Sequence, residues 1–169
     1  SLAGMRVYSP ADWRMVDPLV DVTLRCDGPV YLRLDRQAIA VESATLPDKA
    51  LCGATVLRRG RDVCLVATGV MVPRAIEVAR ALAAKGIVAG VVDLYQLKPV
   101  AAELCLELTR YPRVVTLDEH TLYGGVGTVL AEVMADLPLN IPLRRIGPDE
   151  GELYVHAPRD QLHWELGLD

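Results

Sequence analysis

Hydrophobic and polar positions follow two regular patterns over the last two-thirds of the chain. Short continuous apolar runs alternate with stretches in which apolar residues recur every three to four positions. The runs are typical of buried strands and the stretches of amphipathic helices. The predicted strands are residues 54–58, 63–67, 88–94, 114–117 and 143–146, and the predicted helices are residues 72–85, 99–109, a segment from beyond 127 to about 136, and 158–166.

Alternation of strands and helices predicts an α/β fold with an open, mostly parallel sheet. Because crossovers between parallel strands are right-handed, helices should cover both faces. The turn at residues 59–62 contains Gly60 and indicates a hairpin, so the first strand should be antiparallel to the others.

The first 36 residues carry a separate strand–helix–strand pattern. Val7 and Tyr8 end a short extended segment, and Ser9-Pro10 predicts the start of a helix, because Ser caps free N–H groups and Pro suits the first helical position. Pro18 should kink or restart that helix before it ends near Cys26. Residues 30–34 form the second predicted strand. Residues 35–53 show no period and are interpreted as a linker.

Composition agrees with an aliphatic α/β core. The 169 residues are 51% hydrophobic and include no Phe, so Leu, Val, Ile and Ala must fill the core. A net charge of −4 offers no footprint for nucleic acid or anionic lipid, and no apolar run reaches the roughly 20 residues that span a bilayer. The four cysteines are far apart, which favours reduced thiols and a cytoplasmic protein over disulfides or zinc.

Two glycine sites lie between a predicted strand and a predicted helix. Gly69 and the run at residues 124–127 could expose helix N-termini to a phosphate. Neither matches the dinucleotide or P-loop fingerprint. Tight turns and close helix–sheet packing are the favoured interpretation, and a nucleotide-binding Rossmann domain is disfavoured.

Asp118-Glu119-His120 follows a predicted strand at the edge where open α/β sheets place functional groups. An imidazole beside two carboxylates could perform acid/base chemistry, although no Ser or Cys nucleophile accompanies it. A polar loop that caps the following turn and lies against a partner is an equal alternative. His156 and His163 are interpreted as structural or surface residues.

Arg33 and Arg36 flank the end of the second predicted strand. A guanidinium group there could bind a phosphate through two hydrogen bonds. Alternatively, each arginine forms a surface salt bridge, the commoner arrangement.

Several motifs in order now identify a relationship. They are V-Y-S-P-A-D, D-G-P-V-Y-L-R-L-D-R-Q, V-C-L-V-A-T-G-V-M-V, K-G-I-V-A-G-V-V-D-L-Y-Q-L-K-P, D-E-H-T-L-Y-G-G-V-G-T-V-L-A-E-V and R-R-I-G-P-D. This order resembles the C-terminal half of transketolase-type thiamine diphosphate enzymes, above all the split C-terminal subunits of transketolase. 1-Deoxyxylulose-5-phosphate synthase and the β subunits of 2-oxoacid dehydrogenases are more distant cousins.

The resemblance implies a domain organisation. Residues 1–36 would be the end of a pyrimidine-binding domain, whose earlier part lies upstream, and residues 37–53 a linker. Residues 54–169 would be a transketolase C-terminal domain, a three-layer α/β/α fold with a mixed five-stranded sheet. Its usual role is dimer contact and framing of the substrate channel.

The resemblance implies a role in the site for residues at three positions only. Arg36 in L-D-R-Q matches an arginine that contacts the substrate phosphate in sugar-using members. Glu119 and His120 match a loop where Asp118 replaces the more common Glu, and they are carried as candidate interface or channel residues. No catalytic, cofactor-binding or metal-binding residue is assigned.

The same resemblance places the cofactor chemistry elsewhere. The glutamate that activates thiamine diphosphate and the motif that holds Mg²⁺ and the diphosphate would belong to another domain or subunit. We therefore expect this chain alone to be inactive and not to bind the cofactor. The implied reaction is two-carbon ketol transfer between sugar phosphates, with a second copy and a thiamine-binding domain or subunit as partners. The alternative is a subunit-assembly domain of a 2-oxoacid dehydrogenase β-type subunit.

Overall fold

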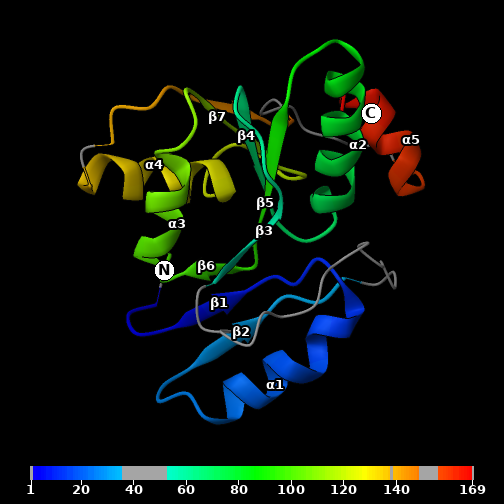
Figure 1. The fold of residues 1–169 in the computed structure, drawn as a ribbon. Coiled ribbons are helices and arrows are strands. Elements are labelled where there is room, and N and C mark those ends of the chain that lie inside the picture. The colour runs from blue at the N-terminus through cyan, green and yellow to red at the C-terminus, as the bar shows by residue number, and fades with distance from the viewer. Residues whose placement is uncertain (1, 36–52, 138, 149–155, 169) are drawn as a thin grey trace.

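A computed structural model describes residues 2–35, 53–137, 139–148 and 156–168 (Figure 1). The strands within these ranges are β1 Arg6–Tyr8, β2 Val30–Leu32, β3 Ala54–Arg58, β4 Val63–Ala67, β5 Ala89–Leu94, β6 Gln96–Lys98, β7 Val114–Leu117 and β8 Leu143–Ile146. The helices are a 3₁₀ helix η1 Trp13–Met15, α1 Val16–Leu24, α2 Met71–Ala84, α3 Ala102–Leu108, α4 Val126–Asp136 and α5 Arg159–Glu165.

Five strands form one mixed sheet in the order β3-β5-β4-β7-β8. β3 runs antiparallel to β5, and the other neighbours are parallel. Helix α2 lies on one face, and α3 and α4 lie on the other (Figure 1). This arrangement confirms the predicted three-layer α/β/α fold with a mixed five-stranded sheet.

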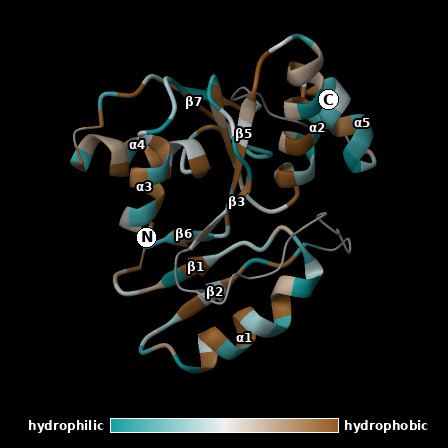
Figure 2. Cartoon of the chain, viewed as in Figure 1, coloured by the Kyte–Doolittle hydropathy of each residue, from teal (hydrophilic) through white to brown (hydrophobic). Residues whose placement is uncertain are grey.

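Strand β4 shows why the central strands read as continuous apolar runs. Val63, Leu65 and Ala67 face the core under α2, whereas Cys64 and Val66 face the core under α3 and α4. Both faces are buried, so no polar position is left in the alternation. The helices instead alternate brown and teal in Figure 2, as expected where one face packs on the sheet and the other meets solvent.

The predicted hairpin between β3 and β4 is wrong, although the antiparallel first strand is confirmed. Strand β5 lies between β3 and β4 and pairs with both. The turn passes along the start of β5, where Arg61 N and Asp62 N donate to Val88 O at 3.0 and 3.1 Å. All six residues of β5 are buried, so this strand needs a neighbour on each side, whereas β3 is half-buried and suits an edge.

A second, three-stranded sheet has the order β2-β1-β6, with β1 parallel to β2 and antiparallel to β6. The sequence did not predict β6, a three-residue strand that follows β5 after Tyr95. Tyr8, Met15 and Leu19 of the N-terminal segment join the same core cluster as α2. The two sheets therefore share a core. The boundaries proposed at residues 36 and 54 stay a prediction, and the linker residues 37–52 lie outside the described residues.

The first helix begins later than predicted. Ser9 and Pro10 precede it outside any helix, and Ser9 N donates to Tyr95 O at 2.7 Å. The cap is Asp12, whose carboxylate accepts from Arg14 N at 2.8 Å. Pro18 is the third residue of α1, where its missing N–H costs nothing, so it restarts the helix and does not kink it.

The other helices agree with prediction to within a few residues at each end. Among the helices that the structure describes, none has both the length and the apolar character that a membrane crossing requires.

Candidate functional site

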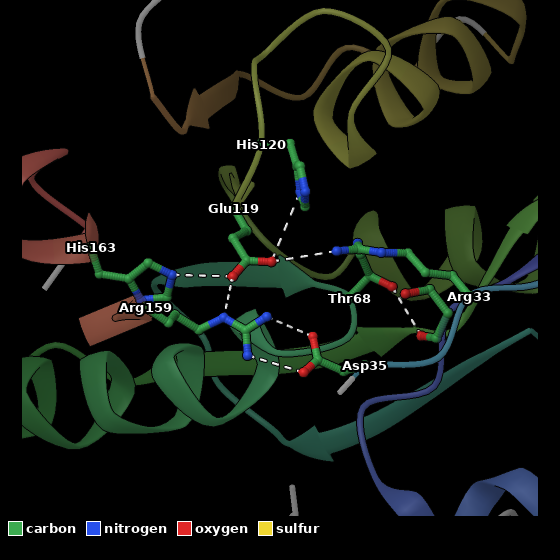
Figure 3. A network of polar contacts seen from close by, with 8 residues as sticks. Arg33, Asp35, Thr68, Glu119, His120, Arg159 and His163 are labelled. Atoms are coloured by element: carbon green, nitrogen blue, oxygen red, sulfur yellow. Dashed lines mark hydrogen bonds and ion pairs between the residues drawn. The ribbon is translucent and has the colours of Figure 1, made fainter. Parts of the chain in front are cut away.

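Glu119, two residues after β7, is the centre of a network of charged side chains (Figure 3). Its Oε1 atom forms an ion pair with Arg159 Nε at 2.7 Å and lies 3.2 Å from His163 Nε2. Its Oε2 atom accepts a hydrogen bond from Arg33 Nη2 at 3.4 Å and lies 3.9 Å from His120 Nδ1. The Glu119 side chain is 13% exposed, so these groups replace most of the water around its carboxylate.

The network joins segments that are distant in the sequence. Arg33 follows β2, and its backbone N–H donates to Tyr8 O at 2.8 Å. Arg159 begins α5, and His163 lies one turn further along the same helix. Figure 2 shows α5 as largely hydrophilic. Arg159 and His163 therefore attach this helix to the loop after β7 through polar contacts to Glu119.

Arg159 also binds Asp35, the last described residue after β2. Its two Nη atoms donate to the two carboxylate oxygens at 3.0 and 2.7 Å, a bidentate geometry. The hydrogen bonds that Arg159 donates to Asp35 raise the pKa of Arg159, burial lowers it, and the charge of Glu119 raises it further. The guanidinium group thus links the end of β2 to the loop after β7.

Asp118 has a different environment from its neighbour Glu119. Its carboxylate accepts from Val126 N at 2.6 Å and from Gly127 N at 3.2 Å, at the first turn of α4. Burial raises the pKa of Asp118, and the two backbone N–H groups partly oppose that rise. An internal carboxylate therefore already occupies the helix N-terminus.

The glycine run is explained by this contact. A Cβ at Gly125 would lie 2.4 Å from Asp118 Oδ1, and one at Gly127 would lie 2.6 Å from Thr116 Oγ1. Gly69 has a φ of +54°, and its Cβ would lie 3.1 Å from Ser9 Oγ. These positions need glycine for close approach and turn geometry, so the structure supports the favoured packing interpretation over a phosphate site.

A pocket of about 260 Å³ opens beside the network. It lies between the small sheet and the edge of the large sheet where β4 and β7 end. The lining residues are Arg33, Thr68, Leu97, Asp118, Glu119, His120, Gly124, Gly125, Val126 and Val129.

The candidate residues from the sequence have separate outcomes. Glu119 and His120 both line the pocket, but the His120 side chain is 67% exposed and lies as far as 3.9 Å from Glu119. Arg33 is held in an ion pair, as its salt-bridge interpretation predicts. Arg36 lies outside the described residues, so its role stays a prediction.

Sequence reasoning missed Arg159 and named no partner for His163. Arg159 was not singled out, because nothing in its spacing relates it to residues 35 or 119. His163 was interpreted as a structural or surface residue, and it is buried against Glu119. The available signal was a helix with few apolar residues that begins with Arg159, but this pattern does not indicate which residues the helix contacts.

The arrangement is suited to holding these chain segments together. A carboxylate shared by two guanidinium groups and a buried imidazole acts as an acceptor that fixes its neighbours. None of the residues that line the pocket is a cysteine, and burial raises the pKa of the Cys64 thiol to about 12. Within the described ranges, no group of three or more His, Cys, Asp or Glu side chains could hold a metal ion. These residues do not fit a Mg²⁺ site.

Comparisons with known proteins agree on one family. The family described as transketolase, C-terminal domain, matches residues 53–169. A 6-deoxy-6-sulfo-D-fructose transketolase subunit of Clostridium sp. (strain MSTE9) is 36% identical over 87% of this chain and 46% of its own length. An apulose-4-phosphate transketolase subunit of Phocaeicola vulgatus is 32% identical over 98% of this chain and 53% of its own length.

Solved structures give the same result. A split-gene transketolase, described as an inactive β4 tetramer, is 36% identical with a TM-score of 0.86, over 99% of this chain and 54% of that one. Transketolase of Pichia stipitis in complex with sedoheptulose-7-phosphate has a TM-score of 0.74 over 97% of this chain and 23% of that one, at 19% identity, which shows the fold alone. The chain spans about half the length of the curated transketolase subunits that it matches. This chain belongs to the transketolase C-terminal domain family.

Proposed function

We propose that this chain supplies the C-terminal part of a transketolase-type enzyme, which transfers a two-carbon ketol unit between sugars that carry an anionic end group. The observation that carries the proposal is the likeness to a split-gene transketolase along 99% of the chain. Two curated relatives are also named as transketolase subunits.

The substrate class is supported by the relatives' names. They contain a sulfonated fructose, apulose-4-phosphate and 1-deoxy-D-xylulose-5-phosphate, three sugars with a terminal anion. Arg36 is the residue that we propose binds this anion, because a guanidinium group matches phosphate and sulfonate oxygens through two hydrogen bonds. The preceding residue, Asp35, is held in the charged network described above.

Replacement of Arg36 tests the proposal in the assembled enzyme. Loss of one charged hydrogen-bonding group costs about 1.5–3 kcal/mol, so Arg36→Ala should raise the KM for a phosphorylated sugar by roughly 10- to 100-fold. Steady-state kinetics with a phosphorylated sugar, its sulfonated analogue and the uncharged sugar measure this. The uncharged sugar should show no change in KM.

Arg74→Ala is the matched control, because Arg74 forms an exposed pair with Glu77 on α2. It should leave all three KM values unchanged. An equal rise in KM for charged and uncharged sugars after Arg36→Ala would contradict anion recognition by Arg36.

Thiamine diphosphate and Mg²⁺ belong to the proposed complete enzyme and would be held by the thiamine-binding N-terminal domain or subunit. We expect calorimetry to detect no saturable micromolar binding of thiamine diphosphate with Mg²⁺ to residues 1–169 alone. Such binding would contradict the proposed division of labour.

Dimer contact and framing of the substrate channel are the proposed roles of residues 54–169. The alternative is a subunit-assembly domain of a 2-oxoacid dehydrogenase β-type subunit. A pull-down that recovers a transketolase N-terminal subunit, with activity on sugar phosphates, supports the first proposal. Recovery of an acyltransferase, with no response to sugar phosphates, supports the alternative.

A further inference from the structure

Arg159 uses all three of its guanidinium nitrogens in ion pairs with two carboxylates. Both Nη atoms meet Asp35 at 3.0 and 2.7 Å, and Nε meets Glu119 at 2.7 Å (Figure 3). A planar fork bound on two sides fixes the relative position and orientation of both partners. The side chains of Arg159, Asp35 and Glu119 are 28%, 18% and 13% exposed, so solvent screens the pairs only partly.

The position of Asp35 in the chain connects this contact to the proposed anion-binding residue. It follows β2 and directly precedes Arg36 in the sequence. A contact that fixes Asp35 fixes the last described residue before Arg36 in the sequence. The partner that fixes Asp35 comes from α5, 124 residues further along the chain.

We infer that Arg159 is a positioning residue: from helix α5 it fixes Asp35, the residue that directly precedes the proposed anion-binding arginine, Arg36. The inference rests on the proposed function, in which Arg36 binds the anionic end of the sugar. It assigns the C-terminal helix a part in substrate affinity, although that helix touches no substrate in this role.

Because the network has other contacts, replacement of Arg159 should disturb Asp35 without unfolding this part of the protein. Without Arg159, Glu119 keeps Arg33 and His163 as partners. Helix α5 therefore keeps its buried contact through His163, which is 7% exposed. Removal of Arg159 therefore mainly affects Asp35, which loses the two hydrogen bonds that Arg159 donates to it.

Kinetics of Arg159→Ala in the assembled enzyme test the inference. The KM for a phosphorylated sugar should rise roughly tenfold while kcat and the KM for the uncharged sugar stay unchanged, since a misplaced binding group weakens only the contact that it makes. Arg159→Lys should recover part of this loss, because a lysine keeps the charge but cannot form the fork.

A double-mutant cycle tests whether Arg159 affects the KM through its contact with Asp35. Asp35→Asn should reproduce much of the rise in KM, and Asp35→Asn with Arg159→Ala should be no worse than either change alone. Arg59→Ala is the control, because Arg59 pairs with Glu107 at 3.2 Å outside the network. It should leave both KM values unchanged.

The outcomes separate this inference from the proposed function. An unchanged KM after Arg159→Ala and Asp35→Asn, or an equal rise for both sugars, overturns the inference. If Arg36→Ala itself leaves the phosphorylated sugar unaffected, the proposed function fails as well. Should Arg159→Ala not fold, Arg159→Lys and Asp35→Asn carry the test, and fully additive losses in their cycle overturn it.

Discussion

The two sheets of this molecule are stabilised in different ways. The five-stranded sheet is built from strands that follow one another closely in the sequence, and apolar side chains cover both of its faces. The three-stranded sheet pairs β6 with β1, a strand near the start of the chain, and buried polar groups lie where the two sheets meet. Local pattern identifies the strands of the first sheet, whereas the second sheet depends on pairing between distant segments.

Removal of a core side chain from the N-terminal segment is the strongest challenge to this comparison. Leu19 in α1 is fully buried in the core that α2 shares, so Leu19→Ala should cost about 2–5 kcal/mol of the free energy of unfolding. Calorimetry should show one transition at a lower temperature. Leu24→Ala, on the exposed side of the same helix, should change stability by less than about 0.5 kcal/mol.

Two separate thermal transitions would contradict the shared core. The small sheet would then unfold independently, and the comparison would concern two units and not one.

The helix cap at Asp118 tests the large sheet. Asp118→Ala leaves the N–H groups of Val126 and Gly127 without their acceptor, so we expect a loss of about 1–3 kcal/mol in chemical unfolding. Asp118→Asn keeps an acceptor oxygen and should lose less. Equal losses for the two variants would show that the charge, and not the hydrogen bonding, matters.

Asp93 tests the junction between the sheets. Its Oδ1 atom has no hydrogen-bond partner within the described part of the chain, and burial, then the charge of Asp12, raises its pKa well above the usual value. The folded state therefore favours the protonated carboxyl. This contribution to stability is complete below the unfolded pKa and is lost as the pH rises through the folded pKa.

Asp93→Asn should consequently stabilise the protein at pH 7, by on the order of 1 kcal/mol. The gain should shrink as the pH falls toward the unfolded pKa of an aspartate, about 4, as measured by denaturation at a series of pH values. A gain that does not depend on pH would show that the pKa of Asp93 does not differ between the folded and unfolded states.

The smallest expected effect is at the edge of the charged network. Arg33 pairs with Glu119 at 3.4 Å and its side chain is 35% exposed, so Arg33→Ala should cost less than about 1 kcal/mol. The difference should decrease further in high salt. A loss several times larger would mean that this ion pair, and not the shared apolar core, holds the two sheets together.

In the large sheet, the sequence predicted where strands lie along the chain better than the order in which they pair. The bounds of β3, β4, β7 and β8 agree with prediction, because each strand lies in a local run with a clear pattern. The position of β5 between β3 and β4 was not predictable, because the residues of a strand do not by themselves determine which strands it pairs with.

The candidate site was predicted only in part. The sequence singled out Glu119 and His120, which line the pocket, because functional groups gather at the ends of parallel strands. Arg159 and Asp35 were missed, since their contact closes a loop of 124 residues and depends on the finished fold. The glycine run at residues 124–127 was interpreted correctly as packing, but the carboxylate of Asp118 that explains it was not foreseen.

The placement of β6 has a consequence for anyone who divides or recombines this protein. If the chain is cut between residues 36 and 53, the C-terminal piece keeps β6 but loses its pairing partner β1. The unpaired backbone groups of β6, which begins two residues after the buried strand β5, are then exposed. Such an exposed edge recruits other chains. Chimaeras with exchanged C-terminal domains should therefore stay monodisperse only when residues 5–35 travel with the domain, which makes the exchangeable module longer than the domain match alone indicates.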